Sequence, residues 1–149
     1  MSRNFYSEIN LHVTWHTKSS APFLTEQVEA AVRHYLRGRC VNTPDIYHEI
    51  GGIEDHVHLC MRVAPTILIS EFIGQLKGAS SHDANQKFGH KVLEWQTGYG
   101  VVSFGAKDLD WVRKYVRNSA IAIVAIASRI VWNGSPRLKP NREKPRKRG

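Results

Sequence analysis

The chain has 149 residues, a length that suits one domain, and 42% of them are hydrophobic, which is enough for a core. The 21 lysines and arginines outnumber the 13 aspartates and glutamates, and the net charge of +8 makes a polyanion the natural partner. The longest apolar run, residues 120–127, is far shorter than the ~20 residues that cross a bilayer, which excludes a transmembrane segment.

The first predicted elements are a strand and a helix. Residues 5–17 alternate between apolar and polar side chains, as in a strand with one buried face. His12 and His16 belong to its polar face, where we expect solvated histidines, with an approach to DNA as the alternative. Residues 25–37 repeat apolar positions at helical spacing after Thr25, a good N-cap, and predict the first helix.

Two further strands follow in close succession. Residues 45–53 predict a strand, with Gly51-Gly52 permitting a bend or bulge near its end, and the next strand begins at His56. Strands joined by only Glu54-Asp55 must be antiparallel neighbours. This acidic link is also placed where a carboxylate can orient a metal-binding imidazole.

The strand at residues 56–63 carries the most informative pattern. His56 and His58 share one of its faces, because side chains on a strand alternate with a period of two. Two imidazoles so placed can bind one divalent cation. The alternative is a strand whose polar face carries histidine without any ligand.

The second half of the chain predicts a helix, a strand and another helix. Apolar residues at helical spacing over 67–76 predict a helix that ends at Lys77, before the small residues 78–81. Residues 91–105 predict a strand or a bent pair of strands. A last helix, residues 109–118, follows Asp108, its expected N-cap. Its inward stripe is predicted to be Leu109, Val112 and Val116.

Tyr115 on this last helix is surrounded by basic residues. Cations beside a phenol favour its anionic form and attract phosphate, whereas the alternative is a boundary tyrosine on an amphipathic helix. The complete element order predicts an α+β fold. The simplest arrangement is a ferredoxin-like split βαβ sandwich with an antiparallel sheet, followed by the C-terminal tyrosine-bearing helix. The basic residues are Arg113, Lys114 and Arg117.

Five motifs occur in a distinctive order. They are NLHVTWHTK, DHVHL, FIGQLKGASS, WQTGYG and YVRN, and they lie between Asn4 and Asn118. In this order they resemble the small HUH single-tyrosine transposases of bacterial insertion sequences, whose domesticated branch is associated with repetitive extragenic palindromes. The resemblance implies a transposase domain over residues 1–118.

The resemblance also implies a chemistry and a set of partners. His56 and His58 would hold a divalent metal, Mg²⁺ or Mn²⁺, and Tyr115 would attack single-stranded DNA beside a hairpin to form a 5′-phosphotyrosine. A homodimer is expected, in which the tyrosine helix of one subunit can complete the metal site of its partner. The expected DNA-binding residues are Lys18, Lys77, Arg113, Lys114 and Arg117. With two cysteines and no secretory pattern, we expect a cytoplasmic protein.

The C-terminal segment 119–149 departs from this pattern. Ser119 stands where the family has a glutamine as third metal ligand, and the apolar residues 120–127 replace an expected basic helix. One nucleotide inserted after codon 118 can, with suitable codons, encode Gln-Arg-Asp-Arg-His-Arg-Arg, so we hypothesise a frameshift. The residues from 136 onward are basic and proline-containing, which predicts a disordered tail. Whether this chain is an active enzyme is left open.

Two other functions compete with a transposase. The first is a DNA-binding module of the same fold that has lost its chemistry. The second is a hydrolase with zinc held by His56, His58 and Cys60, which all lie on one strand face.

Overall fold

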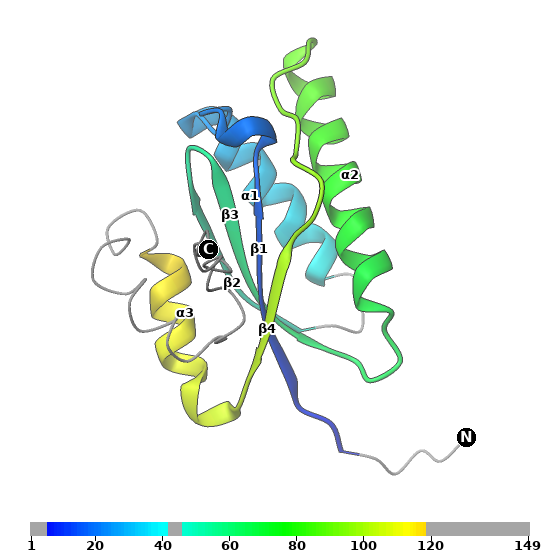
Figure 1. Cartoon of the computed structure of the whole chain (residues 1–149), viewed down its shortest axis with the longest axis vertical. Coiled ribbons are helices and arrows are strands. Elements are labelled where there is room, and N and C mark those ends of the chain that lie inside the picture. The colour runs from blue at the N-terminus through cyan, green and yellow to red at the C-terminus, as the bar shows by residue number, and fades with distance from the viewer. Residues whose placement is uncertain (1–5, 42–45, 119–149) are drawn as a thin grey trace, which may run out of the picture.

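The computed structural model describes residues 6–41 and 46–118. Four strands form one sheet, with two long helices behind it and a shorter helix beside it (Figure 1). Two short 3-10 helices, Lys18–Ser20 and Ala106–Asp108, lie in the connections. The main elements are β1 (Ile9–His16), α1 (Glu26–Val41), β2 (Ile46–Ile53), β3 (His56–Val63), α2 (Ile69–Phe88), β4 (Gly100–Phe104) and α3 (Leu109–Arg117).

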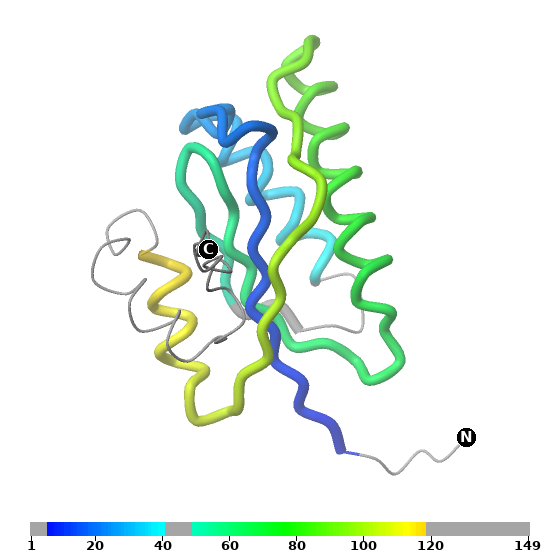
Figure 2. Tube along the Cα trace, viewed as in Figure 1, coloured from blue at the N-terminus to red at the C-terminus, as the bar shows by residue number. Residues whose placement is uncertain are grey.

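The strand order is β2-β3-β1-β4, and every neighbouring pair is antiparallel. β1 and β3 therefore form the centre of the sheet, and Figure 2 shows the trace of β1 running between β3 and β4. Each βαβ half has its two strands separated by a strand of the other half. This is the split βαβ, ferredoxin-like topology, so the predicted fold is confirmed.

Side-chain alternation on the central strands divides the interior into two clusters. The apolar residues of one face pack with α1 and α2, whereas α3 packs on the other face, with its Val112 and Val116 in one cluster with Cys60 of β3. The predicted division of both strands into two faces is therefore confirmed. On the α1 and α2 side, the strands contribute Leu11, Val13, Trp15, Ile50, Val57, Leu59, Met61 and Val63.

Helix α2 does not end at Lys77, as the sequence predicted, but continues to Phe88. The small residues after Lys77 suit the helix because Ser80 and Ala84 extend its buried stripe, where larger side chains would not fit. The hydroxyl of Ser80 donates to the carbonyl of Lys77 and accepts the indole N–H of Trp95. Gly89, in the left-handed conformation, ends the helix.

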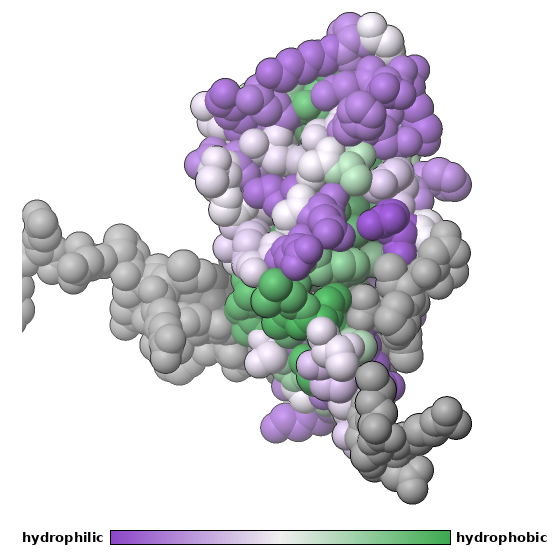
Figure 3. Space-filling model, turned by 90° about the vertical axis from the view of Figure 1, so that its right-hand side faces the viewer, coloured by the Kyte–Doolittle hydropathy of each residue, from purple (hydrophilic) through white to green (hydrophobic). Residues whose placement is uncertain are grey.

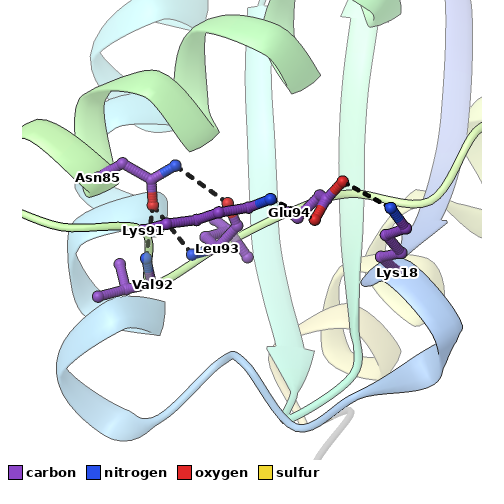
Figure 4. A network of polar contacts seen from close by, with 6 residues as sticks. All are labelled: Lys18, Asn85, Lys91, Val92, Leu93 and Glu94. Atoms are coloured by element: carbon purple, nitrogen blue, oxygen red, sulfur yellow. Dashed lines mark hydrogen bonds and ion pairs between the residues drawn. The ribbon is translucent and has the colours of Figure 1, made fainter.

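The segment between α2 and β4 is held by side chains rather than by a long strand ladder. Asn85 accepts the backbone N–H groups of Val92 and Leu93 and donates to the carbonyl of Leu93 (Figure 4). Glu94 pairs with Lys18 and Lys91. The predicted strand over 91–105 is therefore shortened to β4, with one isolated bridge between Thr17 and Trp95.

Three local predictions differ from the structure. Helix α1 runs from Glu26 to Val41 rather than from 25 to 37. The register shift in β2 lies between Tyr47 and Glu49, not at the two glycines. Asp108 stands at the N-cap of α3, but its side chain makes no capping hydrogen bond.

Gly52 on β2 helps to place the histidine strand. A Cβ at this position would lie 2.6 Å from the carbonyl oxygen of His56, so any side chain here would push β3 away. The glycine therefore allows close approach of the two strands where β3 begins.

Figure 3 shows mainly hydrophilic residues on the side that carries α2, with one hydrophobic patch low on that side. Within residues 6–41 and 46–118, no helix is both long enough and apolar enough to span a membrane.

Candidate active site

The polar face of the sheet, which α3 partly covers, aligns three residues of β1 with three of β3. The register pairs His12 with Cys60, Thr14 with His58 and His16 with His56. Because cross-strand partners on one face lie close together, the sheet gathers four imidazoles within a small area. The rings of His56 and His58 are 4.7 Å apart between centroids.

His58 is held by two residues of β1. Its Nδ1 lies 2.9 Å from Nε2 of His12 and 3.1 Å from the hydroxyl oxygen of Thr14. Burial lowers the pKa of His58 to about 2 and that of His12 to about 4, so both rings are neutral at pH 7. The expectation of a solvated His12 was wrong, because α3 covers that part of the sheet, whereas His16 is exposed.

His56 has a different partner. Its Nδ1 lies 2.7 Å from a carboxylate oxygen of Asp55, the residue just before β3. His16, Asp55 and His56 each place one potential ligand atom within 4.8 Å of the others. Although His16 is exposed, partial desolvation by its neighbours, and then the ring of His56, lower its pKa, which favours the neutral imidazole that binds metals.

Tyr115 lies on α3 directly over this face. Its ring is edge-on to His58 at 5.3 Å and to His12 at 5.8 Å between centroids, and it stacks on Trp111. Burial raises the pKa of Tyr115, so the expected stabilisation of its phenolate by surrounding cations is not observed. The predicted inward stripe of α3 is confirmed for Val112 and Val116, and Tyr115 belongs to it as well.

The residues of the site suit a divalent cation. The Nδ1 atoms of His56 and His58 each contact a side chain of the protein, which leaves Nε2 of each ring as its remaining donor. A hydrogen bond on one ring nitrogen is the usual way to fix the tautomer of a metal-binding histidine. The donor set therefore fits a metal ion held by these two residues.

The chain matches the family of IS200-like transposases over residues 5–119, which is most of its length. The chain belongs to this family. Among solved structures, a candidate transposase from Deinococcus radiodurans R1 is similar, with 22% sequence identity and a TM-score of 0.65 over 78% of this chain and 94% of the other. No curated protein matches the chain.

A second similar structure is a REP-associated tyrosine transposase bound to a REP hairpin. The TM-score is 0.57 and the sequence identity is 16%, over 83% of this chain and 74% of the other. At such low identity, both structures establish the fold rather than any residue's role. The family match places this protein among the transposases, which act in DNA transposition.

The predicted DNA-binding residues of the transposase are not equally available. Lys18 pairs with Glu94, and Arg117 pairs with Glu49. Lys77 donates to two backbone carbonyls near the start of β4. Arg113 is half-buried and its Nε has no hydrogen-bond partner among the described residues, whereas Lys114 is exposed.

Cys60 does not suit the zinc site that was considered as an alternative. It lies under α3 with Val112 and Val116 and is fully buried. Burial raises the pKa of its thiol to about 12, and zinc binds the thiolate. Its position on the same strand face as His56 and His58 is confirmed, but Val112, Tyr115 and Val116 of α3 pack with it.

Sequence reasoning missed the role of His12 and Thr14 as partners of His58. The alternating pattern placed both on the polar face of β1. Only the pairing of β1 with β3 shows which residue they contact. The position expected to hold the third ligand, Ser119, and the segment after it lie outside the described residues.

Proposed function

We propose that this transposase cleaves and rejoins single-stranded DNA through a covalent bond between Tyr115 and a 5′-phosphate. The observation that carries the proposal is the position of Tyr115, whose ring lies 5.3 Å from that of His58 within one chain. A nucleophile and a metal-binding pair must converge on one phosphate, and this arrangement supports such convergence.

His56 and His58 are the proposed metal ligands, with Mg²⁺ or Mn²⁺ as the expected ion. When bound, the ion would offset the charge of the phosphate and polarise it for attack. Asp55 orients His56, while His12 and Thr14 orient His58. These contacts keep both imidazoles fixed while the DNA enters, so the site needs little reorganisation.

Tyr115 is the proposed nucleophile. Its phenol loses a proton to solvent, its oxygen forms a bond to phosphorus, and the bond from phosphorus to the 3′-oxygen breaks. The leaving 3′-oxygen takes up a proton from solvent. The products are a 5′-phosphotyrosine and a free 3′-hydroxyl. Because the phosphoester is exchanged rather than hydrolysed, another 3′-hydroxyl can later displace the tyrosine and rejoin the DNA without ATP.

The proposed substrate is single-stranded DNA next to a hairpin. The net charge of +8 supports binding of a polyanion, and the similar REP-associated transposase is bound to a REP hairpin. Residues 1–118 are the proposed catalytic domain. A homodimer remains our expectation, but the contact of Tyr115 with His58 supports catalysis within a single subunit.

A labelled hairpin oligonucleotide tests the proposal. With Mg²⁺ or Mn²⁺, a label at the 3′ end of the DNA should become attached to the protein, because the 5′-phosphate of that fragment is bound to Tyr115. Tyr115→Phe should form no adduct, whereas Tyr99→Phe, which alters an exposed tyrosine, should react normally. Adduct formation by Tyr115→Phe would contradict the assignment.

A DNA-binding protein of the same fold without chemistry is the second candidate. The sequence feature that favours it is Ser119 in place of the expected glutamine. Such a protein would bind the hairpin oligonucleotide with and without metal and form no covalent adduct.

Sequencing the gene and measuring the protein's mass would test the frameshift hypothesis.

A further inference from the structure

The proposed metal pair has no glutamine at position 119 to complete it, because the sequence has Ser119 there. We propose that His16 of β1 is the third protein ligand and forms a three-histidine cation site with His56 and His58. This inference rests on the proposed function, since it assigns another ligand to the same metal.

The sheet brings His16 to the pair through the register of two neighbouring strands. His16 is the direct cross-strand partner of His56, and their ring centroids are 5.0 Å apart. His58 is two residues further along the same face of β3, with its ring 4.7 Å from that of His56. His56 is therefore the ring that both other imidazoles approach, one across the strands and one along β3.

The distances between ligand atoms suit a shared ion. Nitrogens bound to one ion at about 2.1 Å lie at most about 4.2 Å apart. One ligand atom of His16 and one of His56 lie within 4.8 Å of each other and of a carboxylate oxygen of Asp55, so the imidazole of His16 must come slightly closer to share an ion with His56. His16 is exposed, so an ion can reach it from solvent.

Asp55 acts in this site by orienting His56. Its carboxylate lies 2.7 Å from Nδ1 of His56, which leaves Nε2 of that ring as the proposed ligand atom. The contact of His12 with Nδ1 of His58 does the same on the other side. Two of the three proposed ligands are therefore held in place before any ion binds.

The nitrogen donors have a consequence for metal choice. Replacing the amide oxygen of a glutamine by an imidazole gives three nitrogen ligands. Imidazole binds late first-row ions such as Co²⁺, Ni²⁺ and Zn²⁺ well, whereas Mg²⁺ prefers oxygen ligands. We therefore expect this transposase to bind Co²⁺ much more tightly than Mg²⁺.

Titration of the purified full-length chain with Co²⁺, followed by visible absorption, tests the inference without any DNA. The wild type and His34→Ala, which alters an exposed histidine on α1, should bind one ion with the same spectrum. His16→Ala should bind at least about tenfold more weakly, with a changed spectrum. His16→Gln should recover part of the Co²⁺ affinity that His16→Ala loses. It should also bind Mg²⁺ more tightly than the wild type does, because an amide oxygen replaces an imidazole nitrogen.

The possible failures are distinguishable. If His16→Ala binds Co²⁺ like the wild type while His56→Ala does not, His16 is not a ligand and only this inference is overturned. If the wild type binds no Co²⁺ at all, both this inference and the metal pair His56 and His58 of the proposed function are contradicted. Thermal melting of each variant shows that the protein is folded, and the exposure of His16 makes its replacement tolerable.

Discussion

His12 on β1 and His58 on β3 share a hydrogen bond of 2.9 Å, and their rings stack with centroids 5.1 Å apart. The bond joins Nε2 of His12 to Nδ1 of His58 and so determines which nitrogen of His58 remains for a ligand. The two central strands of the sheet therefore contribute to the site as a pair: β3 carries His56 and His58, and β1 carries the residues that contact His58 together with the proposed third ligand, His16.

Replacing His12 should impair chemistry more than folding. In His12→Phe an aromatic ring remains, but the Nε2 atom that contacts His58 is lost. Adduct formation with DNA should slow by about 10- to 100-fold, as for other residues that orient a metal ligand. Rates from denaturing gels would measure this. His12→Gln, which keeps a polar atom near the position of Nε2, should recover part of the rate, and a wild-type rate for His12→Phe would argue against an orienting role.

Stability should fall in mild acid because of the buried histidines. The pKa values of His12 and His58 in the folded protein are lowered to about 4 and about 2 from 6.5, so the unfolded chain binds more protons. The stabilisation is present above pH 6.5 and is lost as the pH falls from there toward 4, by about 1.4 kcal/mol per pH unit for each residue.

Urea denaturation at pH 7.5 and pH 5 would measure this loss. The wild type should have a lower unfolding free energy at pH 5 than at pH 7.5. This difference between the two pH values should be smaller in His12→Phe, because phenylalanine cannot titrate. It should be unchanged in His34→Ala, whose replaced side chain is exposed. An equal pH dependence in wild type and His12→Phe would show that His12 is not neutral in the folded state.

Adduct formation should become faster as the pH rises. Burial raises the pKa of Tyr115 above 10, so the phenolate is a minor form near pH 7 and grows about tenfold per pH unit below its pKa. Single-turnover rates between pH 7 and pH 9 would measure this. A rate independent of pH across that range would contradict the prediction, because it would mean that the phenolate fraction of Tyr115 does not control the rate.

Two lysines should differ in their effect on DNA binding. Lys114 is exposed and makes no ion pair within the described part of the chain, whereas Lys18 is 2.9 Å from Glu94. Lys114→Ala should weaken single-strand binding and reduce the slope of log affinity against log salt by about 0.7. Lys18→Ala should have a smaller effect, and fluorescence anisotropy over a salt series would compare them.

Lys77 should contribute to the stability of the fold as well as to the positive charge that binds DNA. Its ammonium lies 2.7 Å from the carbonyl oxygen of Gln96 and 2.6 Å from that of Gly98. Lys77→Met keeps most of the side-chain length but loses both bonds, and should reduce the unfolding free energy by about 1 kcal/mol. Urea denaturation would measure it, and unchanged stability would leave DNA binding as the residue's main role.

The sequence alone was sufficient for the order of elements and for the two faces of the central strands. Local periodicity carries this information, because a strand repeats every two residues and an amphipathic helix every three to four. His56, His58 and Tyr115 could therefore be selected as candidates from their spacing and from the order of the motifs. Element ends were less predictable, as the extension of α2 beyond Lys77 shows.

The tertiary structure decided which candidates meet and how each is charged. Nothing local to β1 indicates that His12 contacts His58 or that His16 faces His56, since both contacts depend on long-range strand pairing. The raised pKa of Tyr115 was also unpredictable, because desolvation depends on what α3 covers after folding. The sequence shows which charged residues are neighbours along a helix, but the burial of a side chain depends on the folded structure.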